Sequence, residues 1–282
     1  MDAATEPKLD ALHARLTDIA VDGRFALAFS GGLDSRFVAH AAKMAGLAPL
    51  LLHAEGSHIP ERESLFARQW AVDNGFTLRL LRSDPLAVAE VAENGKLRCY
   101  HCKRALFAML LREADGLALC DGTQASDATA YRPGVRALRE LGVVSPLADA
   151  GLTKAEIRQI AAKTGMTHAD QRARPCLLTR FAYLVPPDAA MLRSLDAAEE
   201  AIDSLLQQEA DHKGPPVPDF RLRLLATGKL ELHVTPPGGN EDGAWPDGPL
   251  LADLEEAVIA ATGKPLFGVR VMASLSGFFD RE

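Results

Sequence analysis

The sequence has no apolar run long enough to cross a membrane, and its longest one, residues 47–53, has the length of a buried strand. Residues 1–20 mix charges of both signs with scattered apolar residues. They therefore lack the apolar centre of a signal peptide and the composition of a transit peptide. These absences predict a cytoplasmic protein without membrane contact.

Cysteine and positive charge are also scarce. The 282 residues include four cysteines, which in a reducing compartment are more often free, catalytic or metal-bound than paired. The formal net charge of −7 argues against a nucleic-acid-binding protein, because such proteins usually carry net positive charge. With 48% hydrophobic and 24% charged residues, the composition is that of a globular protein. The length suffices for one domain of usual size and a smaller second one.

Strands and helices alternate along the first part of the chain. Short apolar runs predict strands at 25–29, 48–53, 77–81 and 116–121, and apolar residues at helical spacing predict helices at 9–20, 34–45, 62–74, 102–114 and 154–164. This alternation predicts an α/β fold, a doubly wound parallel sheet that binds ligands beyond the carboxyl ends of its strands.

The pattern changes near residue 185. The expected elements are then a helix from 188 to about 210, strands at 220–226 and 229–235, a helix at 250–262 and a strand at 266–272. We therefore expect two domains: a larger one at 1–185 with the parallel sheet, and a smaller C-terminal α+β domain at 186–282.

A serine- and glycine-rich turn, Ser30-Gly31-Gly32-Leu33-Asp34-Ser35, follows the first predicted strand. Glycines let backbone amides approach a phosphate, and the N-terminus of the next helix favours an anion. The turn lacks the Gly-Lys-Ser/Thr of the Walker loop and is too short for the dinucleotide fingerprint. It predicts another kind of phosphate loop, and an ordinary turn with an aspartate cap is the competing interpretation.

This turn resembles the loop of the N-type ATP pyrophosphatases, which cleave ATP between its α and β phosphates. The resemblance implies an adenine nucleotide α-hydrolase-like fold, with ATP and Mg²⁺ required and Asp34 near the metal ion. It also implies that residues 1–185 form the ATP pyrophosphatase domain and that residues 186–282 serve substrate binding or oligomerisation. The implied ATP-binding residues are Ser30, Gly31, Gly32, Asp34, Ser35 and Gly122. Fixed dipoles and a metal ion stabilise the charge on leaving pyrophosphate. The loop does not identify the acceptor, because the group includes both amide-forming synthetases and tRNA thiolases.

Three further stretches narrow the resemblance. They are Arg98-Cys99-Tyr100-His101-Cys102-Lys103, then Asp121-Gly122-Thr123-Gln124 with Tyr131-Arg132-Pro133-Gly134, and then Ser145-Pro146-Leu147 with Gly151-Leu152-Thr153-Lys154. Together with the loop they resemble the sacrificial sulfur transferases of the LarE family, which make the nickel-pincer nucleotide cofactor of lactate racemase. The resemblance covers roughly residues 24–235. It implies a pyridinium dicarboxylate mononucleotide as substrate, and a homo-oligomer.

Cys176 stands among the arginines Arg172, Arg174 and Arg180. The thiolate is the reactive form of cysteine, and arginines that face a thiol lower its pKa. In the LarE family the matching cysteine gives up its sulfur and becomes dehydroalanine. The resemblance thus implies that Cys176 is the sulfur donor and that Arg180 and Lys103 are catalytic. A buried structural cysteine is the competing interpretation.

The remaining cysteines have several interpretations. Cys99 and Cys102 form a Cys-x-x-Cys pair, which occurs in redox pairs, zinc sites and iron–sulfur sites. Some relatives transfer sulfur catalytically with a cluster held by three cysteines, so Cys99, Cys102 and Cys176 are a candidate set for an iron–sulfur cluster. We expect the sacrificial route instead, because the pair also matches a structural feature of the family. Cys120 lies in an apolar run and is expected in the core.

Arginines alternate with apolar residues in the predicted strand at 220–226, so Arg221 and Arg223 point to one face. Paired arginines suit a phosphate, and the resemblance implies that this pair binds the substrate phosphate; a solvated strand face is the competing interpretation. His53, Glu55 and His58 follow the second strand, near the expected position of a nucleotide base. The chain departs from the family at Arg36, Leu178 and Thr179, where family members carry small residues.

The sequence thus predicts an enzyme that adenylates a carboxylate with ATP and then transfers sulfur from Cys176. An amide-forming synthetase is a second hypothesis, but it needs an ammonia source, and no glutaminase domain is visible. A third hypothesis is a tRNA thiolase, and a fourth is a nucleotide-binding regulatory protein without turnover.

Overall fold

A computed structural model describes residues 5–129, 133–172, 174–213, 216–235 and 248–280. The chain forms two compact units, described separately below: Met1–Val88 with Cys99–Arg174, and Ala89–Arg98 with Pro175–Glu282. The short segment 89–98 therefore packs with the C-terminal part of the chain. The division of roles between residues 1–185 and 186–282 stays a prediction.

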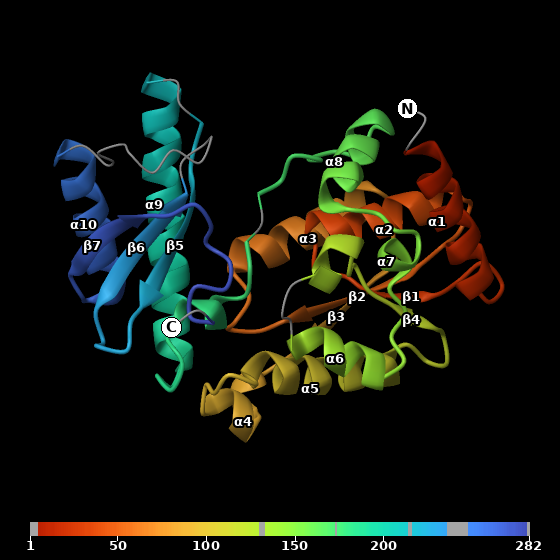
Figure 1. The fold of residues 1–282 in the computed structure, drawn as a ribbon, viewed down its shortest axis with the longest axis horizontal. Helices are drawn as coiled ribbons and strands as arrows, with labels where there is room; N and C mark the ends of the chain where they lie inside the picture. The colour runs from red at the N-terminus through yellow and green to blue at the C-terminus, as the bar shows by residue number, and fades with distance from the viewer. Residues whose placement is uncertain (1–4, 130–132, 173, 214–215, 236–247, 281–282) are drawn as a thin grey trace. The chain divides into compact units, whose positions relative to one another are not determined.

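The first unit is built on a parallel four-stranded sheet with the strand order β3-β2-β1-β4 (Figure 1). Its strands are β1 (Ala26–Ala28), β2 (Leu50–Glu55), β3 (Leu78–Arg82) and β4 (Leu119–Cys120). The strand order reverses between β1 and β4, and in open α/β sheets a ligand crevice forms at such a point. The expected α/β fold with a parallel sheet flanked by helices is confirmed, and the arrangement is consistent with a Rossmann-like fold.

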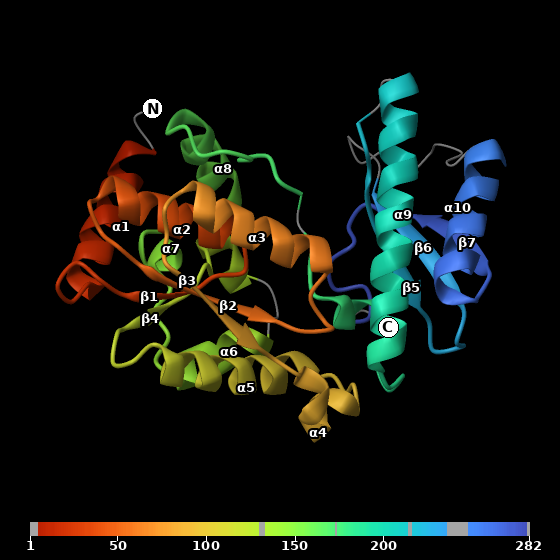
Figure 2. The same ribbon diagram turned by 180° about the vertical axis from the view of Figure 1, so that it is seen from behind.

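Helices cover both faces of this sheet (Figure 2). Leu27 and Leu51 point into one core layer, and Ala26 and Leu52 point into the other, because successive side chains of a strand face opposite ways. The first layer is formed by α1 (Glu6–Ile19), α2 (Leu33–Met44), α3 (Glu61–Asp73) and α8 (Lys154–Lys163). The second is formed by α5 (Arg98–Glu113) and α6 (Pro133–Glu140).

Several short elements connect these helices and strands, and the periodicity of the sequence predicted none of them. They are the α-helices α4 (Ala89–Ala92) and α7 (Pro146–Asp149) and the 3-10 helices η1 (Pro85–Ala87) and η2 (Ala125–Thr129). Tyr131 and Arg132 of the family motif lie outside the described residues.

The second unit carries a three-stranded sheet of order β5-β6-β7, whose strands the sequence predicted. β5 (Asp219–Leu224) and β6 (Leu230–Thr235) form an antiparallel hairpin, and β7 (Leu266–Val271) is parallel to β6. Leu222, Leu232 and Val234 are buried on the sheet, and helix α9 (Ala189–Lys213) packs on α10 (Gly248–Thr262). The 3-10 helix η3 (Leu177–Arg180) adjoins β5, where Phe181 forms a parallel bridge to Leu224.

No helix in the described part of the chain is long and apolar enough to cross a membrane.

Candidate active site

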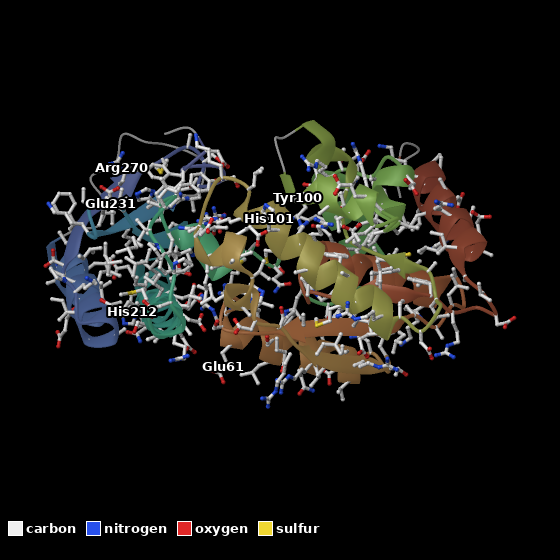
Figure 3. The ribbon with its side chains drawn as sticks, turned by 90° about the horizontal axis from the view of Figure 1, so that it is seen from below. Glu61, Tyr100, His101, His212, Glu231 and Arg270 are labelled. Carbon is white, nitrogen blue, oxygen red and sulfur yellow. The ribbon has the colours of Figure 1, made fainter. Side chains whose placement is uncertain are left out.

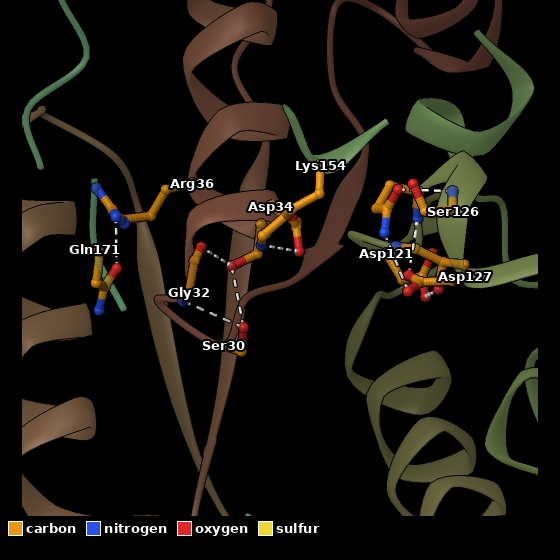
Figure 4. Close-up of polar contacts among 12 residues, drawn as sticks. Ser30, Gly32, Asp34, Arg36, Asp121, Ser126, Asp127, Lys154 and Gln171 are labelled. Atoms are coloured by element: carbon orange, nitrogen blue, oxygen red, sulfur yellow. Dashed lines mark hydrogen bonds and ion pairs between the residues drawn. The ribbon is translucent and has the colours of Figure 1, made fainter. Parts of the chain in front are cut away.

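The phosphate loop lies between β1 and α2, at the carboxyl end of the central strand. Gly31 has φ +77°, and a Cβ built there would lie 2.5 Å from the Cβ of Ala67 on α3, so only glycine fits. Ser35 Oγ donates to the Gly32 carbonyl at 3.0 Å and lies 3.2 Å from Ser30 Oγ (Figure 4). Gly32 caps α2 without a side chain, so no side chain competes with an anion for the first amides of the helix.

Asp34 lies in the first turn of α2 and forms an ion pair with Lys154 of α8. Lys154 Nζ contacts the two carboxylate oxygens at 2.8 and 2.7 Å (Figure 4). Burial raises the pKa of Asp34, Lys154 opposes this, and the charge of Asp127 raises the pKa further. Lys154 is the last residue of the Gly151-Leu152-Thr153-Lys154 stretch, and nothing in the sequence indicated a role for it. The ion pair places Lys154 beside the loop.

Gly122 follows β4 and lies against the loop. A Cβ at this position would lie 2.9 Å from the Ser35 amide nitrogen and 3.2 Å from Asp34. The preceding Asp121 is buried and accepts hydrogen bonds from Thr123 N at 3.1 Å and Ser145 Oγ at 2.7 Å. The predicted ATP-binding residues of β1, α2 and the β4 edge are therefore close together, at the point where the strand order reverses.

The two histidines after the second strand are buried. His53 Nδ1 lies 2.8 Å from the Phe29 carbonyl and its Nε2 lies 3.3 Å from Ser64 Oγ. Burial lowers the pKa of His53, and it lowers the pKa of His58 to about 4. Burial therefore favours the neutral form of both imidazoles. Glu55 pairs with Arg68 of α3.

Lys103 and the Cys-x-x-Cys pair lie at the start of α5. Cys99 is exposed, whereas Cys102 is half-buried, and burial together with Cys99 raises the pKa of Cys102 to about 11. The side chain of Lys103 packs against Gly134, where a Cβ would lie 2.6 Å from Lys103 Cδ. Cys120 is fully buried in the core, as expected.

No group of three His, Cys, Asp or Glu side chains that could hold a metal ion occurs among the described residues. Cys99 and Cys102 lie in different stretches of the chain from Cys176, which belongs to the second unit. The three-cysteine cluster stays a hypothesis.

Cys176 caps η3 in the second unit and is partly buried. Arg180 Nη1 lies 3.0 Å from the Pro175 carbonyl and 3.5 Å from that of Cys176. The guanidinium of Arg180 is buried and donates to both carboxylate oxygens of Glu199 at 2.9 and 2.7 Å. Arg180 thus contacts the carbonyl groups of the two peptides that flank the Cα of Cys176, while its charge is paired with Glu199. The expected effect of the arginines on the Cys176 thiol stays a prediction.

Glu199 of α9 is a site residue that the sequence pattern did not indicate. It accepts the Leu222 amide of β5 at 2.9 Å as well as the guanidinium of Arg180. One carboxylate therefore joins η3, α9 and β5. Its signal in the sequence was weak, because a glutamate in a long charged helix usually faces solvent.

Arg221 and Arg223 project from the same face of β5, and the structure does not support the interpretation of a solvated strand face. Arg223 is buried, and burial followed by the charge of Arg180 lowers the pKa of Arg221 to about 10. Both guanidinium groups donate to the carbonyl of Leu275, Arg221 at 2.8 Å. Arg223 also stacks on Phe278 at 4.6 Å. The C-terminal segment around Leu275 and Phe278 therefore covers the two arginines.

Further charged residues extend this face of the small sheet. Glu231 of β6 lies opposite Arg223 and His233 lies opposite Arg221 in the strand register. Arg270 of β7 pairs with Glu231 at 3.0 Å, and the two side chains are labelled in Figure 3. The η3 segment and both predicted phosphate-binding arginines thus lie in one unit, linked through Arg180 and Glu199.

Comparison with known proteins gives distant relatives, and no protein-family model matches the chain. The chain is 34% identical over 167 residues to an uncharacterized protein of Synechocystis; the match covers 57% of this chain and 61% of that protein, less than two thirds of its length. It is 27% identical over 209 residues to an uncharacterized protein of Methanocaldococcus jannaschii, covering 68% of this chain and 75% of that protein.

A third relative has a named activity. The chain is 27% identical over 208 residues to the pyridinium-3,5-bisthiocarboxylic acid mononucleotide synthase of Lactiplantibacillus plantarum, covering 72% of this chain and 74% of that enzyme. This similarity supports the resemblance to the LarE family.

Proposed function

We propose that this protein is an ATP-dependent sulfur transferase. It adenylates a carboxylate of a pyridinium dicarboxylate mononucleotide and replaces the activated oxygen with sulfur from Cys176, a step in nickel-pincer cofactor biosynthesis. The observation that carries the proposal is the similarity to the thiocarboxylate-forming synthase over 208 residues. The loop, Asp34 and Gly122 lie together between β1 and β4, where the strand order reverses. This position supports ATP binding by an adenine nucleotide α-hydrolase-like unit.

The first chemical step is adenylation. A carboxylate oxygen of the substrate attacks the α-phosphorus of ATP, and pyrophosphate leaves. The glycine loop and the uncapped first turn of α2 stabilise the charge that develops on pyrophosphate. Activation makes the carboxylate oxygen part of a good leaving group, AMP.

Asp34 is the residue that would hold Mg²⁺. Mg²⁺ in nucleotide sites is usually bound by one or two carboxylates together with substrate phosphates, so the absence of a three-residue metal cluster among the described residues does not conflict with it. Burial and the nearby charge of Asp127 disfavour the ionised form of Asp34, and a cation offsets both effects. When bound, Mg²⁺ neutralises phosphate charge.

The second step transfers sulfur. The Cys176 thiolate attacks the acyl carbon, the C–O bond to AMP breaks and a thioester forms. A base then removes the Cα proton of Cys176 while the Cβ–Sγ bond breaks. The products are a thiocarboxylate and dehydroalanine at position 176, and the sulfur electron pair leaves with the product. Arg180 and Glu199 orient this segment. Arg221 and Arg223 would bind the substrate phosphate in place of the Leu275 carbonyl, to which both guanidinium groups donate in the ligand-free chain.

The proposal is tested by incubating the protein with ATP, Mg²⁺ and pyridinium-3,5-dicarboxylic acid mononucleotide. We expect pyrophosphate, AMP and a thiocarboxylate product in equal amounts. Cys176→Ala is expected to release pyrophosphate and AMP without forming a thiocarboxylate. Thiocarboxylate formation by Cys176→Ala, or pyrophosphate release that requires ammonia and gives an amide, contradicts the proposal.

A further inference from the structure

Arg36 is a fully buried charge in contact with the phosphate loop. It lies in α2, directly after Ser35, the last residue of the loop, with 0% of its surface exposed. Its Nε donates to the carbonyl of Gly31 at 2.9 Å. Gly31 is the loop residue with positive φ that packs against Ala67. Arg36 therefore holds the carbonyl of the loop residue whose backbone conformation other residues rarely adopt.

The remaining donors of Arg36 bind a segment that is distant in the sequence. Nη1 donates to the Thr167 carbonyl at 2.7 Å, and Nη2 donates to the His168 carbonyl at 2.9 Å. Nη2 also donates to the side chain of Gln171 (Figure 4). The guanidinium also lies over the ring of Phe66 at 5.1 Å. Burial is tolerable for this charge because its donors are bound to acceptors.

Helix α3 holds the same two segments from a second side. Glu63 and Ala67 are four residues apart and therefore lie on one face of α3. Ala67 packs against Gly31, whereas Glu63 accepts Gln171 Nε2 at 3.2 Å and Arg174 Nη1 at 3.1 Å. The contacts therefore run without a break from the loop, through Arg36 and Gln171, to Arg174, two residues before Cys176 in the chain.

We infer that Arg36 is a positioning residue that holds the phosphate loop and residues 167–171 as one body within the first unit, so that the part of this unit that precedes Cys176 in the chain is fixed relative to the loop. The effect that we expect of Arg36 on sulfur transfer rests on the proposed function. The structural coupling itself can be tested without turnover. Lysine cannot replace Arg36, because an ammonium group lacks the planar fork that reaches carbonyls of two segments at once.

Hydrogen exchange of the ligand-free protein tests the coupling. Arg36→Met is compared with His40→Leu, a matched control on the same helix, because His40 Nε2 bonds Thr164 Oγ1 at 2.9 Å without touching the loop. In Arg36→Met we expect amides of residues 30–35 and of 166–171 to exchange about ten-fold faster or more, and we expect no change at 30–35 in the control. An effect on only one segment, no effect, or the same loosening in His40→Leu overturns the inference. If Arg36→Met does not fold, Arg36→Lys takes its place in the comparison.

The catalytic meaning is tested by the ratio of thiocarboxylate formed to pyrophosphate released. A fold-stabilising role alone would reduce both products equally, because only the folded fraction would change. We expect the ratio in Arg36→Lys to fall about ten-fold or more, with AMP released by hydrolysis of the adenylate. An unchanged ratio overturns the positioning role. If the wild-type protein releases no pyrophosphate or forms no thiocarboxylate, the proposed function fails, and the exchange comparison still decides the coupling.

Discussion

At the scale of single residues, the protonation state of Asp34 depends on several neighbouring groups. Burial and Asp127 raise the pKa of its carboxyl group, whereas Lys154 and Arg158 lower it. Only the ionised carboxylate binds Mg²⁺ well, because a hard cation prefers charged oxygen ligands. The ion pair with Lys154 therefore helps to keep Asp34 in the form that the proposed chemistry needs.

Asp34→Ala is expected to abolish the conversion of ATP to AMP and pyrophosphate. Because the half-buried carboxylate is paired with Lys154 and lies outside the hydrophobic core, its loss removes the proposed metal ligand without opening a cavity in that core. Pyrophosphate release is measured, and circular dichroism checks the fold. Undiminished release from a folded variant would show that Asp34 has no role in the reaction.

Lys154→Met is expected to move the acid limb of the pH–rate profile to higher pH. Lys154 lowers the pKa of Asp34, so its removal lets burial raise that pKa further, and more alkaline conditions are then needed to ionise the carboxylate. Pyrophosphate release is measured from pH 5 to 9. Lys163→Met, an exposed change at the far end of α8, is the control. Superimposable profiles for wild type and Lys154→Met would rule out this coupling.

The phosphate loop was recognisable in the sequence because its residues are contiguous. Two adjacent glycines directly after a predicted strand also indicate a turn that brings backbone amides close to a ligand. Lys154, Glu199 and the contacts of Arg36 were not recognisable as site features. Their partners lie in distant parts of the chain, so the pattern around each one shows only an ordinary charged residue on a helix. Arg36 stood out as a departure from the family, but its burial and its carbonyl acceptors are properties of the folded chain.

At the scale of elements, periodicity predicted the long helices and the seven strands of the described residues to within a few residues. Strand β4 is shorter than the predicted strand at 116–121, because it pairs with β1 only at Leu119 and Cys120. Helices α6 and α7 were missed, since one or two turns leave too few positions for a helical repeat. The face shared by Arg221 and Arg223 followed from alternation, whereas the covering segment around Leu275 has no repeat that predicts it.

Arg221→Ala and Arg223→Ala are each expected to weaken binding of the mononucleotide by about 1 to 3 kcal/mol, the range for hydrogen bonds to a charged group. Binding is measured by calorimetry with the phosphorylated substrate and its dephosphorylated nucleoside. Arg79→Ala on the exposed strand β3 is the control and is expected to bind normally. Equal affinity of the wild-type protein for the two ligands would remove the phosphate-binding role.

Phe278→Ala is expected to lower the free energy of unfolding by about 3 kcal/mol, the low end of the range for loss of a buried phenylalanine. Phe278 is buried and contacts His233 and Arg223, so its loss also removes the aromatic face on which Arg223 lies. The control is Phe267→Ala, because Phe267 is 57% exposed. Urea denaturation gives both values. Equal small effects of the two substitutions would show that the C-terminal segment does not pack on the sheet.

At the scale of the whole molecule, the question is whether one polypeptide acts once or many times. The sacrificial route uses the sulfur of Cys176 alone, whereas the cluster route needs Cys99, Cys102 and Cys176 as thiolate ligands. Burial raises the pKa of Cys102 to about 11, so at neutral pH this thiol is protonated in the metal-free protein. A bound cluster would itself deprotonate this ligand, so the pKa of Cys102 is compatible with either route.

Intact-protein mass after turnover distinguishes the two routes. If Cys176 donates its sulfur, the mass falls by the elements of hydrogen sulfide, about 34 Da, as the Cβ–Sγ bond breaks and dehydroalanine remains. Cys99→Ala and Cys102→Ala are expected to show the same loss and one round of transfer, because neither thiol takes part. An iron-containing protein that turns over many times at constant mass, and that loses activity in Cys99→Ala, would contradict the sacrificial mechanism. Such a result would leave the adenylation chemistry intact and would make Cys99 and Cys102 cluster ligands, since a cluster-bound sulfur can be replaced and the protein's own cysteine sulfur cannot.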